Sequence, residues 1–559
     1  MPFISGGDRY QVMFTALDDM VAPDSEARVI DAFVGSLDLD AMGFGRAQAP
    51  DRGRPAYEPA DLLKLYLYGY RNGIRSSRKL ARACEVNVEV MWLIGSLAPD
   101  FRTVANFRRD NAGALKAVFG EFAARVMAGM ELGFQSVDGT KVRASNAKDR
   151  NFTASKLDDR IARLESHVGE YMRLLDEQDA EDDAVAAGGL PRAELERKLA
   201  EAEERLARYE GYRDKMEAEG LPQLSLTDPD AKLMKSRGGF EVAYNVQAAV
   251  DSGTHIITDF EATDRPTDHG LLGPTLAGLV PEGGVLEATA DKGYADAADM
   301  AACLDAGIIP NVILPDGKDF YELEYDYDPA GGDASSVEPG QLAACLRAGQ
   351  VPDAYAHAVE SAEVVEKKAF VRNPADAPAA GSVEEMRGRA AEGLFVRDAG
   401  RNLVVCPAGE LLRQKSVKRN GNIRYANKLA CRRCPDKGRC ISGNGKWKEV
   451  DFPKDVLEKP CRKWGAVGAA AAKAQAEGHY ETRKVVVVKL RPDRAKCARR
   501  MCLSEHPFGT IKRAMGADSF LLRGLEKVNA EFALMATGYN LARAMSLLGF
   551  GGLMEAVRG

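Results

Sequence analysis

The first 125 residues carry apolar side chains at the spacing of amphipathic helices. In Pro59–Tyr70 the apolar positions recur every three or four residues, and Ser76–Ser77 offers an N-cap to a further helical segment, Arg78–Cys84. We therefore predict an N-terminal helical domain over residues 1–125. Several short helices that are joined by tight turns and carry arginines suit a helix-turn-helix-like DNA-binding unit, and a plain helical bundle is the alternative.

A heptad pattern occupies the next long segment. Apolar residues step by four and three from Leu157 to Leu175, and the pattern resumes from Leu195 to Tyr209 after a break that contains glycine and proline. Two apolar stripes separated by a turn predict an antiparallel helical hairpin over residues 156–220. Its polar faces are acidic, which favours a spacer or a dimer contact over a chemical site.

Between these helical regions, and again after the hairpin, apolar and polar residues alternate with the period of two that is typical of β-strands. A short strand is expected at Phe134–Asp138, and Glu241–Val250 and His255–Glu261 flank a hairpin turn. Further segments alternate between helix and strand, and we expect them at residues 268–279, 286–291, 295–306 and 308–314. This order predicts a mixed α/β sheet with helices on both faces, and it suggests a ribonuclease-H-like core over residues 130–320 and 485–559.

Residues 317–483 show no sustained periodicity and contain stretches rich in glycine, alanine and proline. We interpret residues 320–484 as an insertion or a second small domain. The core is expected to resume with a helix over Arg499–Met515 and to end with an amphipathic helix over Leu521–Leu548.

Composition limits the class of protein. A chain of 559 residues with 45% apolar and 28% charged residues is an ordinary globular protein of several domains, which excludes global disorder. Its apolar runs are too short for a membrane span, and its start lacks the pattern of a secretory signal. Ten cysteines are too few for a disulfide scaffold, so we expect a reducing, cytoplasmic compartment and no membrane partner.

The charge is unevenly distributed. The net charge of the chain is −7, but Leu411–Arg513 holds 27 lysines and arginines against 9 aspartates and glutamates. A local positive field of this size attracts a polyphosphate such as DNA, and a solvated lysine-rich surface is the alternative.

Two aspartates occupy matching places. Asp138 and Asp291 each end a predicted strand, and each is followed at once by a turn that contains glycine and lysine. Carboxylates at the ends of neighbouring strands repel each other unless a cation lies between them. Hard oxygen ligands without histidine favour Mg²⁺ or Mn²⁺ over Zn²⁺.

A third acid, Glu505, lies on the predicted helix that follows the fifth strand. Lys512 follows seven residues later, two turns along the same helix face. One face therefore offers a carboxylate for a metal ion and a cation for phosphate. This combination fits phosphoryl transfer with two metal ions.

Four cysteines have the spacing of a metal knuckle. Cys406 precedes the run Cys431-x₂-Cys434-x₅-Cys440, which predicts a structural zinc site; buried thiols that bind no metal are the alternative. Cys461 could replace one of the four. Four bases lie inside the knuckle, which favours contact with a DNA backbone over catalysis.

These motifs together resemble the DDE transposases of bacterial insertion sequences, closest to the IS1182 group within the wider IS4/IS5-like families. The resemblance runs nearly from end to end and rests on five segments: Gly53–Pro59, Arg71–Arg78, Val137–Lys141, Ala290–Tyr294 and Glu505–Arg513.

The resemblance implies a catalytic triad of metal ligands, Asp138, Asp291 and Glu505, with two Mg²⁺ or Mn²⁺ ions. It implies cleavage of double-stranded DNA at the ends of a mobile element and joining of the 3′ ends to target DNA, by a homodimer or higher oligomer. The bases expected to contact this DNA are Lys141, Arg499, Arg500, Lys512 and Arg513; Arg499 and Arg500 both remain candidates for the arginine of the family's Y-R-E-K signature. A DNA-binding protein of the same fold without activity, and a metal-dependent nuclease that only cuts, are the alternatives.

Overall fold

The computed structural model describes residues 10, 14–45, 56–180, 191–236, 239–370, 381–418, 421–441, 445–453, 456–461, 463–465 and 480–558. The chain divides into two compact units. The first consists of Met1–Asn151, Ser225–Val365 and Val485–Gly559, and the second of Phe152–Leu224 and Glu366–Lys484. None of the described helices combines the length and the apolar character needed to cross a membrane.

The amino-terminal part of the first unit is helical, as the apolar spacing predicts. Its helices are α1 (Glu26–Gly35), α2 (Pro59–Arg71), α3 (Ser77–Val86), α4 (Val88–Leu93), α5 (Phe101–Asp110) and α6 (Ala112–Met127). Ser25 and Asp100 accept hydrogen bonds from backbone amides in the first turns of α1 and α5, which fixes where these helices begin. Gly53–Pro55 of the family segment lies outside the described residues.

A mixed sheet forms the centre of this unit. Its strands are β1 (Gln135–Arg143), β4 (Lys232–Ser236), β5 (Gly239–Asp251), β6 (Ile257–Thr263), β7 (Leu286–Ala290) and β8 (Ile308–Val312). The order is β4-β5-β1-β7-β8, and β6 also pairs with β5. β5 is antiparallel to β1, β4 and β6, whereas β7 is parallel to β1 and to β8.

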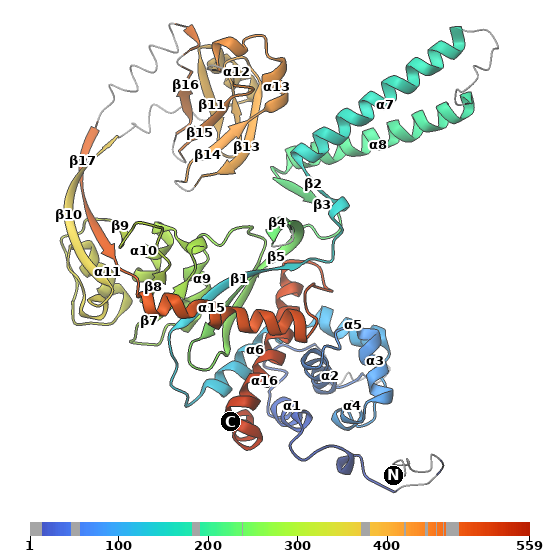
Figure 1. Cartoon of the computed structure of the whole chain (residues 1–559), viewed down its shortest axis with the longest axis vertical. Helices are drawn as coiled ribbons and strands as arrows, with labels where there is room; N and C mark the ends of the chain where they lie inside the picture. The colour runs from blue at the N-terminus through green and yellow to red at the C-terminus, as the bar shows by residue number, and fades with distance from the viewer. Residues whose placement is uncertain are drawn as a thin grey trace, which may run out of the picture. The chain divides into compact units, whose positions relative to one another are not determined.

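Helices cover both faces of the sheet. Successive side chains of β5 point to opposite faces, and along most of the strand the side chains on both faces are buried. Val246, Ala248 and Val250 pack in one core with α6 and the last helix, α16 (Leu525–Arg558). Ala249 and Val137 point to the other face, into a second core with α9 (Leu272–Leu276) and α10 (Ala297–Asp305). Helix α15 (Arg494–Gly509) contacts β1, β5, β7 and β8 and lies across the sheet in Figure 1.

Several element boundaries differ from the sequence prediction. β1 continues to Arg143 instead of ending at Asp138, because β5 pairs with it along its whole length. The helix expected at 268–279 is reduced to α9 and a 3₁₀ turn, since Gly270 has a left-handed backbone conformation. α15 begins earlier than expected because Asp493 caps it, and α16 runs from Leu525 to Arg558.

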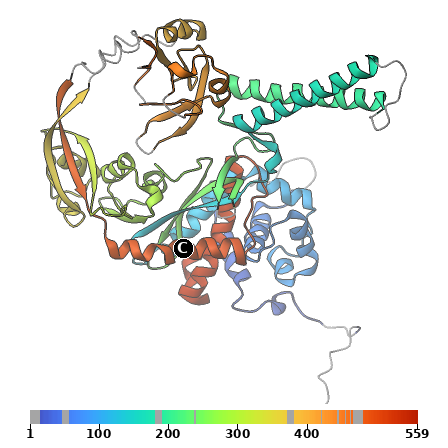
Figure 2. The ribbon, with the colours of Figure 1, turned by 45° about the horizontal axis from the view of Figure 1, so that its top comes forward.

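Residues 317–483 are more regular than the sequence indicates. β9 (Tyr321–Asp326), β10 (Val359–Phe370) and β17 (Tyr480–Leu490) form a three-stranded sheet in the order β10-β17-β9. Together with α11 (Pro339–Arg347), β9 and β17 supply side chains to the core around α10. The chain therefore leaves the first unit along β10 and returns along β17, and these strands lie side by side in Figures 1 and 2.

The second unit contains a helical hairpin and a six-stranded sheet, which an ion pair between Glu217 and Arg413 connects. α7 (Ala154–Ala180) and α8 (Arg192–Ala218) lie side by side as a helical hairpin where the heptads predict it (Figures 1 and 2). The short paired strands β2 (Asn151–Thr153) and β3 (Gln223–Ser225) directly precede α7 and follow α8, respectively. The break at 184–190 lies outside the described residues. The six-stranded sheet is composed of β15 (Glu449–Phe452), β14 (Ile423–Ala426), β13 (Leu411–Val417), β12 (Leu403–Val405), β11 (Leu394–Asp398) and β16 (Glu458–Pro460), in that order.

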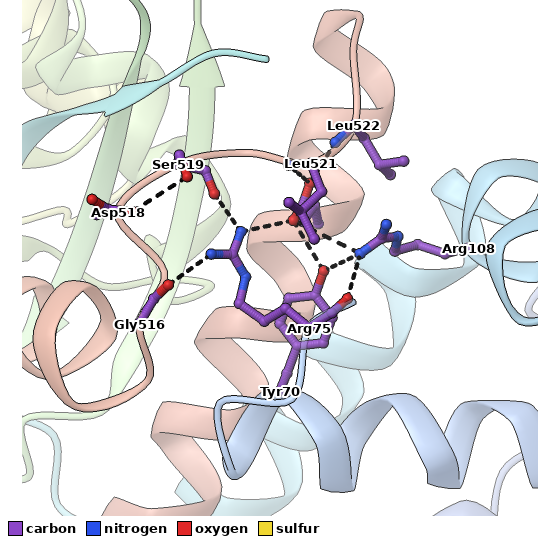
Figure 3. Close-up of polar contacts among 9 residues, drawn as sticks. Tyr70, Arg75, Arg108, Gly516, Asp518, Ser519, Leu521 and Leu522 are labelled. Carbon is purple, nitrogen blue, oxygen red and sulfur yellow. Dashed lines mark hydrogen bonds and ion pairs between the residues drawn. The ribbon is translucent and has the colours of Figure 1, made fainter. Parts of the chain in front are cut away.

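A buried ion cluster joins the amino-terminal helices to α16 (Figure 3). Glu531 has no exposed surface, and its Oε1 accepts hydrogen bonds from Arg75 Nη2 at 2.9 Å and from the Tyr70 hydroxyl at 3.0 Å. Arg108 Nη1 lies 3.8 Å from the same oxygen. The backbone amides of Leu521 and Leu522 both donate to Glu531 Oε2 at 2.9 Å.

This cluster also fixes the segment that follows α15. Arg75 donates to the carbonyl oxygens of Gly516, at 2.9 Å, and Ser519. Arg75 and Arg108 are each less than a tenth exposed, so neither guanidinium is available to contact DNA. The arginines that the sequence offers as a DNA-binding feature are here partly structural.

Glu531→Ala should lower the free energy of unfolding by about 3–5 kcal/mol, because it leaves two buried guanidinium groups without their carboxylate. Chemical denaturation of the full chain measures this. Glu85→Ala is the matched control: it removes an exposed ion pair with Arg82 and should cost about 0.5 kcal/mol or less. Equal losses of unfolding free energy in the two variants would show that the buried cluster stabilises the protein no more than an exposed ion pair does.

Candidate functional site

Asp138 and Asp291 lie on neighbouring strands of the mixed sheet, Asp138 within β1 and Asp291 directly after β7. β1 and β7 pair in parallel register, Gln135 with Ala288 and Ser136 with Thr289. Continuing that register by two residues brings Asp138 opposite Asp291, which directly follows β7 and caps the next 3₁₀ turn by accepting a hydrogen bond from Gly293 N at 2.6 Å. The sequence prediction of neighbouring aspartates is therefore consistent with the strand register.

Helix α15 covers the Asp138 carboxylate. Ser504 Oγ donates to Asp138 Oδ2 at 3.0 Å, and Arg500 Nη1 lies 3.4 Å from the same oxygen. Burial raises the pKa of Asp138, and the nearby Asp291 adds to this rise, although Arg500 and Ser504 act in the opposite direction. The folded protein thus holds this carboxylate in surroundings that disfavour its charge.

Glu505 is exposed on α15 and lines an open cavity of about 860 Å³ together with Asp138. Lys512 lines the same cavity, from a π-helical turn (Thr510–Ala514) that directly follows α15. Among the residues that the structure describes, no group of three or more histidine, cysteine, aspartate or glutamate side chains has an arrangement that could hold a metal ion. The structure therefore places the predicted acids in one region but does not bring the three together as a ligand set.

The five predicted DNA-contacting bases have different surroundings. Lys141 Nζ lies 3.2 Å from Asp268 Oδ1, and Lys512 Nζ donates to Thr140 Oγ1 at 2.6 Å and to the Lys141 carbonyl oxygen at 2.8 Å. Of the two candidate signature arginines, Arg500 is the one beside Asp138. Arg499 is exposed; its Nη2 donates to the Ser252 carbonyl oxygen at 3.1 Å and its guanidinium packs on the Phe134 ring. Arg513 is exposed on the cavity wall.

Sequence reasoning missed four polar residues in this region. Asp268 accepts hydrogen bonds from the side chains of Asn245 and Gln247, and the Tyr294 hydroxyl donates to Gln247 Oε1. Asn245, Gln247 and Tyr294 are almost completely buried. A signal was present in the sequence: two amide side chains interrupt the apolar run of β5 at alternate positions, which places them on one face.

The predicted knuckle cysteines share one small cavity in the second unit. Cys406, Cys431, Cys434 and Cys440 line it, and its volume is about 20 Å³. Cys461 lies nearby, with its Sγ 3.9 Å from that of Cys440. The hydrogen bond between these two thiols lowers the pKa of Cys461 and raises the pKa of Cys440. Like the carboxylates, the described thiols do not form a group of three at metal-binding separations.

Asp138→Asn should raise the melting temperature of the metal-free protein at pH 7.5. Because folding raises the pKa of Asp138, the folded state binds more protons than the unfolded state between the two pKa values, and stability falls as pH rises through that interval. At a pH below about 4, the pKa of Asp138 in the unfolded chain, the gain in melting temperature should vanish.

Thermal unfolding in a chelator at pH 7.5 and at pH 4 measures this effect. Asp264→Asn, which removes a half-exposed acid outside the cavity and its long ion pair with Lys232, should change the melting temperature little. A lower melting temperature of Asp138→Asn at pH 7.5 would contradict the prediction.

Two segments of the chain match known domain families. Residues 15–110 match a transposase domain (DUF772), and residues 405–545 match a transposase DDE domain. The second match includes Glu505 and the knuckle cysteines, whereas Asp138 and Asp291 lie outside both. No curated protein and no solved structure matches the chain. The two domains indicate a transposase of the DDE type, consistent with the IS1182 group.

Proposed function

We propose that the chain is an active DNA transposase that cleaves the ends of a mobile element and joins the freed 3′ ends to target DNA. The observation that carries this proposal is the register of β1 and β7, which brings Asp138 opposite Asp291. Glu505 lies on the wall of the cavity that Asp138 lines. Like charges at neighbouring strand positions repel each other unless a cation lies between them, and this need for a cation fits metal-dependent chemistry on phosphate.

The strand order supports a ribonuclease-H-like core for this enzyme. β6, β5 and β1 are antiparallel neighbours, and β7 and β8 follow in parallel on the other side of β1. Ligands of such sheets bind at the carboxyl ends of the parallel strands, which is where Asp291 lies.

The donor chemistry of the acids fits Mg²⁺ or Mn²⁺, because all of them offer hard carboxylate oxygens. We assign Asp138, Asp291 and Glu505 to the two divalent ions of the family, which when bound neutralise the charge that grows on the phosphate. Arg500 and Ser504 orient Asp138, as their contacts with its Oδ2 indicate. The exposed Arg499 and Arg513 are assigned to the DNA backbone.

Alanine at any one of Asp138, Asp291 and Glu505 should reduce Mg²⁺-dependent cleavage of element ends at least about 100-fold and leave DNA binding unchanged. Cleavage of labelled end fragments and gel-shift titration measure the two properties. Glu555→Ala is the matched control for Glu505, since Glu555 is an exposed helical glutamate far along α16. Full cleavage by the triple variant would disprove the assignment.

Pre-cut element ends with free 3′-hydroxyls distinguish the proposed function from its alternatives. A transposase joins such ends to a target plasmid, a cutting-only nuclease cleaves intact ends without joining, and a protein without activity only binds them. Because both ends must be held together for joining, we propose a dimer or higher oligomer on DNA.

We also propose a structural zinc ion in the second unit. Four thiols line a cavity whose volume of about 20 Å³ suits a single ion, since a water molecule needs ~10–15 Å³ by this measure. Cys461, 3.9 Å from Cys440, is a further donor at the same place. Binding of zinc would bring the sulfur atoms of these cysteines closer together.

The purified protein should contain about one zinc ion per chain, measured by elemental analysis after dialysis. Cys434→Ser should lose the metal and lower the stability of the second unit. Cys502→Ser is the control, because Cys502 is exposed and lies outside this cavity. Metal-free wild-type protein that retains full stability would contradict the proposal.

A further inference from the structure

A fourth acid, Asp268, lies beside the proposed triad and has no role in the function described above. Three donors converge on its Oδ1: Asn245 Nδ2 at 2.7 Å, Gln247 Nε2 at 2.9 Å and Lys141 Nζ at 3.2 Å. Its side chain is 26% exposed and lines the same cavity as Asp138 and Glu505. An oxygen held by three donors is fixed in position.

The backbone of β1 is shaped to admit this carboxylate. Gly139, the residue after Asp138, pairs with Gln247, and a Cβ added to Gly139 would lie only 2.6 Å from Asp268 Oδ1. Any other residue would therefore exclude Asp268 from this place. The Asp268 carboxylate therefore lies against β1 at Gly139, the residue that follows Asp138.

The donors that hold Asp268 are themselves oriented. The Tyr294 hydroxyl donates to Gln247 Oε1, so the amide nitrogen of Gln247 is the atom that faces Asp268. Tyr294 belongs to the 3₁₀ turn that Asp291 caps. The network thus connects Asp268 to the same turn as one member of the proposed triad.

Two acceptor oxygens at this place lack a donor within the described part of the chain. Asp268 Oδ2 accepts no hydrogen bond there. A Cβ built on Gly293 would lie 3.6 Å from this oxygen and 2.7 Å from Asp291 Oδ1. Asn245 Oδ1 is completely buried without a partner and lies 3.0 Å from a Cβ built on Gly139. Oxygens without donors near a further carboxylate, that of Asp291, favour a cation.

We propose that Asp268 is a positioning residue for the divalent-ion site. Its Oδ1 is held by three donors, so its negative charge and its second oxygen are fixed near Asp291, on the wall of the cavity that Asp138 also lines, and increase the affinity of the site for a divalent cation. Lys141 partly neutralises this charge. The proposal rests on the transposase function proposed above.

Titration of the metal-free, full-length protein with Mn²⁺, followed by calorimetry or electron paramagnetic resonance, tests the proposal without DNA. Asp268→Asn keeps an oxygen that can accept the three hydrogen bonds, and it replaces the charge and the second oxygen with a neutral amide nitrogen. It should weaken Mn²⁺ binding about tenfold or more. Asp264→Asn, which removes an acid of the same loop outside the cavity, should bind Mn²⁺ as the wild type does.

Lys141→Met separates an electrostatic role from a purely structural one. It removes one of the three donors and leaves the Asp268 carboxylate less neutralised, so it should tighten Mn²⁺ binding. If Asp268 served only to hold its neighbours together, Lys141→Met would weaken binding as Asp268→Asn does. This variant also keeps the proposal testable if Asp268→Asn fails to fold.

The outcomes distinguish this proposal from the function on which it rests. Mn²⁺ binding that Asp138→Asn abolishes and Asp268→Asn leaves unchanged would overturn the role of Asp268 and retain the proposed function. Wild-type protein that binds no Mn²⁺ would overturn both. Weakening by Asp268→Asn together with tightening by Lys141→Met supports the proposal.

Discussion

The first unit depends on the burial of a single carboxylate, that of Glu531, in the interior of the protein. Burial of an isolated charge is very costly, and here Arg75, Arg108, Tyr70 and two backbone amides surround it. The cluster draws together segments from both ends of the chain. The two regions that match separate transposase families are therefore linked by charge as well as by apolar packing.

Small residues bring these segments into close contact around the cluster. A Cβ on Gly538 of α16 would lie 3.1 Å from the backbone nitrogen of Arg71, and Gly73 approaches the carbonyl oxygen of Met515. Met515 directly follows the π-helical turn that carries Lys512. The amino-terminal helices thus fix the end of the segment that supplies Glu505 and Lys512 to the cavity.

Local patterns predicted much of this fold, because the periods of helices and strands are readable within single segments. The helical hairpin and the strands before and after Asp251 lie where the pattern placed them. The predicted end of β1 at Asp138 was wrong. Asp138-Gly139 has the composition of a turn, and only pairing with β5 extends the strand to Arg143.

The candidate site was predictable to a similar extent. Asp138 and Asp291 were found because each ends a predicted strand and precedes a turn that contains glycine and lysine, which is a local feature of the sequence. Asp268 was not found, since its three donors come from two other segments, β1 and β5, which only the folded sheet brings together. Cysteine spacing predicted the shared cavity, whereas the proximity of Cys440 to Cys461 depends on the fold of the second unit.

The contact between Ser504 and Asp138 has a consequence for biosynthesis. The two residues are 366 positions apart, and the whole second unit is translated between them. At ~5–20 residues per second, Asp138 waits roughly 20–70 s on the ribosome before its covering helix exists. A chain whose translation stops before Ser504 therefore lacks the helix that covers the Asp138 carboxylate.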